Sequence, residues 1–156
     1  MDITNIKGNE VSLQIVVNDA KDETKIHHYI YYIVDNKSGN RIGELMIYRS
    51  DNPEEFLYCG NVGIELYEEY RYKGYSGKAF ELAKVVLKML GIDKVILTCE
   101  STNVASFKSM EKVGAKYVDE KEVPKDNFSY KDGLRNVKVY EYYLDEEGKI
   151  NNEKRN

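Results

Sequence analysis

The chain has 156 residues, which is enough for one domain with a substantial buried core. Its 23 basic and 27 acidic side chains give a formal net charge of −4, which argues against general nucleic-acid binding. The two cysteines, Cys59 and Cys99, are too few for a disulfide framework, and we expect both to be buried free thiols. The sequence shows neither an amino-terminal signal region nor an apolar run of membrane-spanning length, so we expect a cytoplasmic protein without a membrane partner.

The first part of the chain is predicted to be rich in strands, because apolar, β-branched and aromatic residues recur with the period of a strand. The expected elements are strands over 12–17, 26–35, 41–48 and 61–66, a polar loop over 18–25 and a hairpin turn at 36–40. His27 and His28 are neighbours on one strand and point to opposite faces, so they cannot share a metal ion. We expect no metal site.

The stretch 65–90 reads as the end of a strand, a turn rich in glycine and basic residues, and an amphipathic helix. The apolar residues of the helix fall on one face, at Ala79, Ala83, Val86, Leu87 and Leu90. Gly91 is the expected carboxyl-terminal cap. The free N–H groups of the first helical turn suit an anion, and Gly74 and Gly77 let the backbone approach it closely. Arg71, Lys73 and Lys78 add positive charge.

The second part of the chain alternates strands and one helix. We predict a buried strand over 94–99, a helix that Thr102 caps and Gly114 closes, a strand over 116–123, a polar loop over 125–136 and a last strand over 137–144. The predicted fold class is α+β, with a mixed, mostly antiparallel sheet flanked by helices. The predicted organisation is one domain over residues 1–145 and a charged tail over 146–156.

Two motifs resemble those of the GNAT superfamily of acetyl-CoA-dependent N-acetyltransferases. The residues Arg71–Ser76 are similar to its Arg/Gln-x-x-Gly-x-Gly/Ala motif, with Ser76 in place of Gly or Ala. The stretch 97–106 resembles the family's strand followed by Asn-x-x-Ser/Ala, and 111–115 resembles its Glu-Lys-x-Gly-Phe/Ala exit. The motifs stand in the family's order and cover the central third to half of the chain. The resemblance implies a GNAT-like fold and an acetyltransferase that uses acetyl-CoA as acyl donor.

The resemblance also assigns residues to the cofactor. Backbone groups at Leu66 and Tyr67 are expected along the pantetheine arm. The pyrophosphate is expected among Arg71, Tyr72, Lys73, Gly74, Tyr75, Ser76 and Gly77. Asn103, Ser106 and Phe107 are expected to line the cofactor from the second motif, although Asn103 also suits a helix cap and Phe107 also suits the core.

The catalytic residues are less directly indicated. Relatives often use a tyrosine as proton donor, and its place falls on Met110, which cannot donate a proton. The family's glutamate bases lie on its two central strands, where the nearest carboxylates here are Glu65 and Glu100. Both are also plausible as solvated or ion-paired side chains, and water can relay the proton instead.

Three functional hypotheses follow. The first is direct acetyl transfer to a primary amine, on a small molecule or a peptide, with no covalent enzyme intermediate. The second is a GNAT-like module that binds acyl-CoA without turnover. The third is an interaction domain that uses the tyrosine-rich strands. A homodimer is expected only from the resemblance to the family, whose members often dimerise. The family usually carries one or two helices between its first two strands, where this chain has only residues 18–25, and the acceptor is not identified.

Overall fold

The computed structural model describes residues 2–21, 26–52, 54 and 56–144, with only the backbone of residue 56. None of the helices in these ranges has the length and apolar character needed to cross a membrane. The chain divides into two compact units, which are described one at a time. Unit 1 comprises Met1–Arg49 and Val62–Ile92, and unit 2 comprises Ser50–Asn61 and Asp93–Asn156. The expected single domain over 1–145 stays a prediction, and the predicted tail over 146–156 lies outside the described residues.

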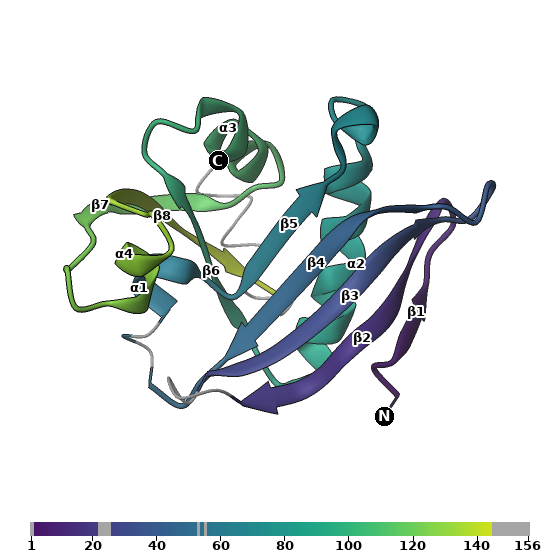
Figure 1. The fold of residues 1–156 in the computed structure, drawn as a ribbon, viewed down its shortest axis with the longest axis horizontal. Coiled ribbons are helices and arrows are strands. Elements are labelled where there is room, and N and C mark those ends of the chain that lie inside the picture. The colour runs from purple at the N-terminus through teal and green to yellow at the C-terminus, as the bar shows by residue number, and fades with distance from the viewer. Residues whose placement is uncertain (1, 22–25, 53, 55, 145–156) are drawn as a thin grey trace. The chain divides into compact units, whose positions relative to one another are not determined.

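Unit 1 is built on a five-stranded sheet in which each strand pairs antiparallel with the next along the chain (Figure 1). Its strands are β1 (Asn5–Lys7), β2 (Val11–Lys21), β3 (His27–Asp35), β4 (Arg41–Arg49) and β5 (Val62–Leu66). The turn between β3 and β4 is the predicted hairpin, with Gly39 at φ 75°. The sheet order leaves β5 as an edge strand of this sheet.

The helix α2 (Tyr75–Met89) covers one face of that sheet and supplies much of the unit's core (Figure 1). The helix buries Ala79, Phe80, Leu82, Ala83, Val86 and Leu87. The helix contacts β2, β4 and β5, whose buried residues include Leu13, Leu45 and Leu66. The apolar spacing seen in the sequence therefore marks the true core face, and the predicted Gly91 follows the helix in the left-handed region at φ 78°.

The predicted loop over residues 18–25 is wrong for its first four residues. Residues 18–21 continue β2, where Ala20 pairs with His28 and Lys21 with His27 across a bulged register. Their exposed and mostly polar side chains gave no strand pattern, because sheet pairing uses backbone groups and sets no demand on an exposed face. Residues 22–25 lie outside the described residues.

Unit 2 holds a three-stranded antiparallel sheet in the order β6-β8-β7. Its elements are α1 (Phe56–Cys59), β6 (Lys94–Glu100), α3 (Val104–Lys112), β7 (Lys116–Glu122), α4 (Phe128–Lys131) and β8 (Asn136–Tyr143). Within each unit every described strand pair is antiparallel, so the parallel component of the predicted mixed sheet is absent from both described sheets. The short helix α4 falls within residues 125–136, which the sequence analysis took for loop alone.

Helices contact both faces of the sheet of unit 2. On one face Tyr140 of β8 donates a hydrogen bond of 2.6 Å to Glu111 of α3. Val137 and Val139 point to the other face, where they form a cluster with Val123 that Tyr58 of α1 packs against. The helix α3 is capped by Asn103, whose side chain accepts from the Ser106 amide at 3.2 Å, and not by Thr102 as predicted. The strand β6 runs on to Glu100, which places the first helical residue later than expected.

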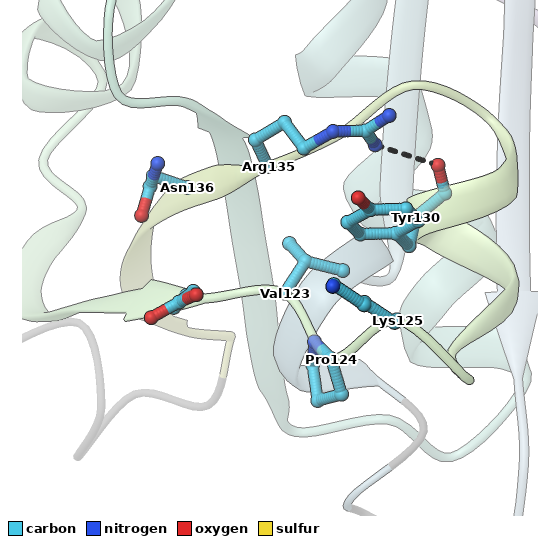
Figure 2. A pocket seen from close by; sticks show the side chains of 7 residues that line it. Val123, Pro124, Lys125, Tyr130, Arg135 and Asn136 are labelled. Atoms are coloured by element: carbon cyan, nitrogen blue, oxygen red, sulfur yellow. Dashed lines mark hydrogen bonds between the residues drawn. The ribbon is translucent and has the colours of Figure 1, made fainter.

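The connection between β7 and β8 contains α4, and one arginine in it binds backbone carbonyls of the same connection (Figure 2). Arg135 lies with its guanidinium carbon 3.6 Å from the centre of the Tyr130 ring. Its Nη1 donates to the backbone carbonyls of Tyr130, at 2.8 Å, and of Leu134, at 3.0 Å. The arginine thus satisfies carbonyls at the end of a four-residue helix that is too short to be stable alone.

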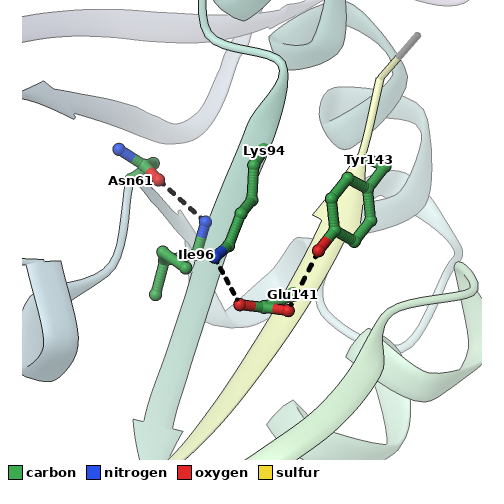
Figure 3. A network of polar contacts seen from close by, with 5 residues as sticks. All are labelled: Asn61, Lys94, Ile96, Glu141 and Tyr143. Atoms are coloured by element: carbon green, nitrogen blue, oxygen red, sulfur yellow. Dashed lines mark hydrogen bonds and ion pairs between the residues drawn. The ribbon is translucent and has the colours of Figure 1, made fainter. Parts of the chain in front are cut away.

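A second polar network lies along β6 (Figure 3). Asn61 is 4% exposed, and its side-chain oxygen accepts from the amide of Ile96 at 2.8 Å. Lys94, the first residue of β6, forms an ion pair of 2.8 Å with Glu141 of β8, and Tyr143 donates to the same carboxylate. Asn61 therefore replaces a strand partner for the backbone of β6, while the ion pair joins β6 to β8 at the surface.

Candidate functional site

The residues predicted to hold the cofactor's pyrophosphate form one continuous turn in unit 1. The strand β5 ends at Leu66, a 3₁₀ turn follows over Glu68–Tyr70, and α2 begins at Tyr75. The turn contains two left-handed residues, Tyr72 at φ 62° and Gly74 at φ 84°. Left-handed backbone is common for glycine and rare for a bulky residue, so Tyr72, which is 93% exposed, marks a constrained loop.

The amino-terminal end of α2 is open to a ligand. Gly74 is the N-cap residue and has no side chain with which to bond the first-turn amides. A Cβ built on Gly74 or on Gly77 would meet no atom within 4 Å. The helix runs for 15 residues, so its aligned peptide dipoles favour negative charge at this end. The geometry fits a phosphate group held by backbone N–H donors.

The three basic side chains of this turn have different surroundings. Arg71 donates from Nε to the carbonyl of Leu66 at 2.9 Å, which fixes the arginine beside the end of the strand. Lys78 forms an ion pair of 2.7 Å with Glu10, which offsets its charge. Lys73 is exposed, and no described residue forms an ion pair with it. Among the described residues Lys73 is thus the cation of the turn without an ion-pair partner, and Arg71 is the anchored one.

The backbone hydrogen bonds at the end of β5 show which of two amides, Leu66 or Tyr67, is able to donate to the thioester carbonyl of a bound acyl donor. The amide of Tyr67 donates to the carbonyl of Ile42 on β4 at 2.9 Å, so that N–H is already used. In an antiparallel pair, successive residues of a strand direct their backbone groups alternately toward the partner strand and away from it. Leu66 directly precedes Tyr67. The Leu66 amide is therefore directed away from β4, toward the open edge of the sheet of unit 1.

Glu65, one of the two predicted bases, lies on the face of the sheet opposite α2. It is exposed and pairs directly with Glu44 of β4, so two carboxylates are side by side. Tyr32 continues the same row on β3, and the Arg41 guanidinium lies 3.9 Å from the centre of its ring. The sequence analysis missed Glu44, because the register that sets it beside Glu65 depends on the loop between β4 and β5.

The residues of the second motif lie in unit 2. Asn103 caps α3 through the amide of Ser106, which is the alternative role that the sequence allowed for it. Phe107 is half-buried, and the ammonium of Lys138 lies 4.0 Å from the centre of its ring. Their predicted contact with the cofactor stays a prediction.

Glu100, the other predicted base, is held by the backbone of unit 2. Its Oε2 accepts from the amide of Arg135 at 3.2 Å, and its Oε1 accepts from the amide of Asn136 at 3.4 Å. Two such bonds fix the carboxylate at the start of β8 and use one acceptor position on each of its oxygens. Of the two predicted bases, Glu65 has the more accessible carboxylate.

Comparison with known proteins identifies the family. A model of the acetyltransferase (GNAT) domain matches residues 9–116, which include the turn and both of its flanking elements. The chain belongs to the GNAT acetyltransferase family. It is a GNAT-type N-acetyltransferase domain of α+β fold. No curated protein matches the sequence significantly.

Solved structures of GNAT proteins share this fold. A GNAT acetyltransferase from Bacillus anthracis is 20% identical over 74% of this chain and 66% of its own, with a TM-score of 0.57. A GNAT acetyltransferase from Elizabethkingia anophelis, solved with acetyl-CoA bound, is 12% identical over 88% of this chain and 100% of its own, with a TM-score of 0.63. A ribosomal-protein-S5-alanine acetyltransferase from Vibrio fischeri is 19% identical over 76% of this chain and 63% of its own, with a TM-score of 0.56. The chain thus spans just under two thirds of the length of the Bacillus and Vibrio proteins.

Proposed function

We propose that this GNAT domain transfers the acetyl group of acetyl-CoA directly to a primary amine. The match of the GNAT domain model over residues 9–116 carries the proposal. The open amino-terminal end of α2, with Gly74, Gly77 and the free cation of Lys73 around it, supports it independently. The acetyl-CoA bound to the Elizabethkingia relative agrees with the choice of cofactor.

The residues of unit 1 supply a place for the cofactor. The first-turn amides of α2, from Tyr75 to Gly77, and the side chains of Arg71 and Lys73 would hold its pyrophosphate. The edge of β5 at Leu66 offers its backbone amide to an extended arm, whereas the Leu66 carbonyl accepts from Arg71. Bound acetyl-CoA supplies an activated thioester. Asn103, Ser106 and Phe107 are proposed to contact it from the second motif.

The reaction needs no covalent enzyme intermediate. The amine nitrogen forms a bond to the acetyl carbon, the carbon–sulfur bond breaks, and the thiolate of CoA takes up a proton. The Leu66 amide can stabilise the negative charge that develops on the carbonyl oxygen. Glu65 can accept the amine's proton directly or through water, since its carboxylate is exposed on the sheet face next to Leu66. Cys99 is a poor alternative nucleophile, because burial raises the pKa of its thiol.

The acceptor is proposed only at the level of a primary amine, on a small molecule or a peptide. The Vibrio relative carries the name of a ribosomal-protein alanine acetyltransferase, and its likeness at 19% identity extends to the fold alone. A ribosomal protein amino terminus is therefore one arm of an acceptor screen, beside polyamines, lysine peptides and small metabolite amines. The expected cytoplasmic location and homodimer are likewise proposals.

The decisive experiment measures cofactor binding and CoA release on the same preparations. We expect acetyl-CoA at about a hundred times its dissociation constant to stabilise the protein by about 2.7 kcal/mol in thermal unfolding. Lys73→Ala should weaken this stabilisation without lowering the stability of the free protein, because Lys73 has no described partner to lose. Release of free CoA in the presence of an amine then reports turnover.

Lys7→Ala is the matched control, since Lys7 is an exposed lysine of unit 1 on β1, outside the turn. If Lys73→Ala and Lys7→Ala bind acetyl-CoA equally well, the cofactor site proposed at α2 is wrong. If acetyl-CoA stabilises the protein but no amine yields CoA, the second hypothesis holds, that of a GNAT-like module that binds acyl-CoA without turnover.

A further inference from the structure

A pocket in unit 2 and an open sheet face in unit 1 both lie outside the turn that is proposed to hold the cofactor. The pocket has a volume of about 440 Å³ and is lined by residues between 122 and 136, around α4 (Figure 2). The ring of Tyr130 lies between its two cations, Lys125 and Arg135, which therefore do not meet on one ligand group. The sheet face carries Glu65, the proposed base, which makes that face the place for an amine acceptor.

The open face of unit 1 is the face of its sheet that α2 does not cover (Figure 1). Side chains that are directly opposite each other on paired strands share a face, so the register sorts them into rows. The carboxylate row contains Tyr32 of β3, Glu44 of β4 and Glu65 of β5. The apolar row contains Val17 of β2, Ile30 of β3, Met46 of β4 and Gly63 of β5. The two rows are two residues apart along β3, β4 and β5, which separates them by roughly 7 Å.

The apolar row is only partly covered. Its side chains, those of Val17, Ile30 and Met46, are half-buried. Gly63 has no side chain, and a Cβ built on it would lie 3.1 Å from Cε of Met46, so the methionine side chain lies across the backbone of β5. A methionine side chain is unbranched and adjusts to different apolar shapes. The row therefore suits a small apolar body that lies flat on the sheet, such as an aromatic ring.

The carboxylate row selects the ligand's charge. Glu44 and Glu65 are directly opposite each other, and among the described residues neither forms an ion pair. The guanidinium carbon of Arg41 lies 3.9 Å from the centre of the Tyr32 ring, so one positive charge accompanies the two negative ones and the row carries a net charge of −1. A bound ammonium removes the repulsion between the two carboxylates. A monoamine balances the row, whereas a diamine leaves an excess positive charge.

We propose that the acceptor is a small primary monoamine with an apolar body, such as an arylalkylamine. Its ammonium lies on Glu44 and Glu65, and its body lies on Ile30 and Met46. This inference rests on the proposed function, because Glu65 and the neighbouring amide of Leu66 are the groups to which the transfer is assigned. Glu44 is a positioning residue, which holds the charged amine beside Glu65.

The proton balance of the transfer follows from this placement. The ammonium gives one proton to Glu65, directly or through water, and becomes a nucleophile. Its nitrogen then bonds to the acetyl carbon as the carbon–sulfur bond breaks. The second proton of the nitrogen reaches the thiolate of CoA through water, so that the products are the N-acetylated amine and the free thiol.

The probe is 2-phenylethylamine, titrated by calorimetry into the whole protein with excess free CoA, so that binding is measured without transfer. Ethylamine keeps the charge without the ring, and 2-phenylethanol keeps the ring without the charge. Each should bind at least about tenfold more weakly than 2-phenylethylamine. The same should hold for 1,4-diaminobutane, which is a dication without an apolar body.

Two variants test the two rows separately. Met46→Gln keeps the size of the side chain but makes it polar, and should weaken the binding of 2-phenylethylamine severalfold while leaving that of ethylamine unchanged. Glu44→Gln should weaken the binding of both amines severalfold. In turnover with 2-phenylethylamine, Glu44→Gln should raise KM severalfold and change kcat by less than about twofold, because Glu44 positions the amine and takes up no proton.

Matched controls locate the binding. Val85→Thr changes an exposed apolar residue of α2, and Glu69→Gln removes an exposed carboxylate of the 3₁₀ turn. Both should bind 2-phenylethylamine like the wild type. The inference is overturned if ethylamine, 2-phenylethanol or 1,4-diaminobutane binds as tightly as 2-phenylethylamine, or if Met46→Gln and Glu44→Gln both bind it like the wild type.

Failure of the inference and failure of the proposed function give different results. Equal kcat/KM values for ethylamine and 2-phenylethylamine overturn the inference and leave acetyl transfer to an amine intact. If 2-phenylethylamine binds with the expected dependence on Met46 and Glu44 but no amine releases CoA from acetyl-CoA, the face binds the amine and the proposed transfer is wrong.

Discussion

Each of the two units of this GNAT domain is stabilised internally in a different way. In unit 1 a single long helix buries six residues on a five-stranded sheet, and Tyr31, Ile33, Leu45 and Ile47 are completely buried beneath it. In unit 2 the helix α3 buries no residue, and every residue of β7 is at least partly exposed. Unit 2 relies more on polar anchors. Asn61 and Glu100 bind backbone groups 35 residues away, and Arg135 binds the nearby carbonyl of Tyr130.

The difference in packing between the two units corresponds to the feature that each unit holds in place, a turn in unit 1 and a pocket in unit 2. The turn proposed to hold the cofactor in unit 1 needs a helix end that does not move, and a helix packed along one whole face provides it. The pocket of unit 2 is shaped by a loop whose Tyr130 and Leu134 pack on the cluster around Val137. Polar side chains, Arg135 and Glu100, also bind the backbone of this loop. Changes to apolar residues should therefore be felt most in unit 1, and changes to polar anchors most in unit 2.

The largest expected effect tests the apolar side of this comparison. Leu87 of α2 is fully buried, and Leu87→Ala should lower the free energy of unfolding by about 2–5 kcal/mol. Val104 of α3 is 49% exposed, and Val104→Ala should change it by less than about 0.5 kcal/mol. Urea unfolding followed by circular dichroism measures both. Equal losses in the two variants would contradict the picture of a core concentrated under α2.

The next largest effect tests the polar anchors. Glu100→Ala leaves the amides of Arg135 and Asn136 without their acceptor and should destabilise the protein by about 1–3 kcal/mol. Hydrogen exchange should show the loss at the amides of residues 135 and 136 and in the loop around α4, and not in α2. Glu122→Ala is the control, because Glu122 is exposed and forms no described ion pair. Loss of protection spread evenly over both units would contradict a local role for Glu100.

The sequence predicted the elements whose cause is local. The strand over 26–35 and the helix over 75–89 follow from the spacing of their apolar residues, and the left-handed residues Gly39 and Gly91 end a turn and a helix as expected. The family motif located the turn between Leu66 and Tyr75, and the structure gives that turn the open helix end which the residues implied. These features depend on neighbours along the chain, so a single sequence contains them.

What the sequence did not predict depends on residues far apart. Glu100 is bound by amides 35 and 36 residues away, and Glu44 is set beside Glu65 by a strand register. Thr102 and Asn103 are both common helix caps, and the structure uses Asn103, three residues after the end of β6 at Glu100. The pocket around Arg135 was missed for another reason. The carbonyls that Arg135 binds are only one and five residues away, and a polar stretch with one arginine does not show which carbonyls the arginine will bind.

A pair of buried tyrosines, one in each unit, gives a smaller and more exact comparison. Tyr31 of unit 1 donates to the carbonyl of Ile3 at 2.8 Å, and Tyr140 of unit 2 donates to the carboxylate of Glu111. Tyr31→Phe should cost about 0.5–1.5 kcal/mol at pH 7, because the carbonyl loses a donor in a partly buried place. Tyr140→Phe should cost less, since the exposed Glu111 can be solvated by water.

The same two residues make stability depend on alkaline pH. Burial raises the pKa of Tyr31 to about 12, and burial together with the bond to Glu111 raises the pKa of Tyr140. A pKa that is higher in the folded state contributes stability that is complete below the unfolded pKa of about 10 and is lost as pH rises toward the folded value. Urea unfolding between pH 9 and pH 12 should show this decline, and each Phe variant should show a shallower one. An unchanged slope in both variants would contradict the assignment to these hydroxyls.

The smallest effect separates stability from catalysis on the open face of unit 1. Glu65 and Glu44 are like charges directly opposite each other, so Glu65→Gln should stabilise the fold by roughly 0.2–1 kcal/mol. If Glu65 accepts the amine's proton, the same variant should release CoA about a hundredfold more slowly at saturating substrates. Glu69→Gln removes an equal charge from the exposed 3₁₀ turn and should change neither quantity measurably. A more stable Glu65→Gln protein with wild-type turnover would assign Glu65 no catalytic part and leave water as the proton carrier, because the carboxylate of Glu100 is already bound by two backbone amides.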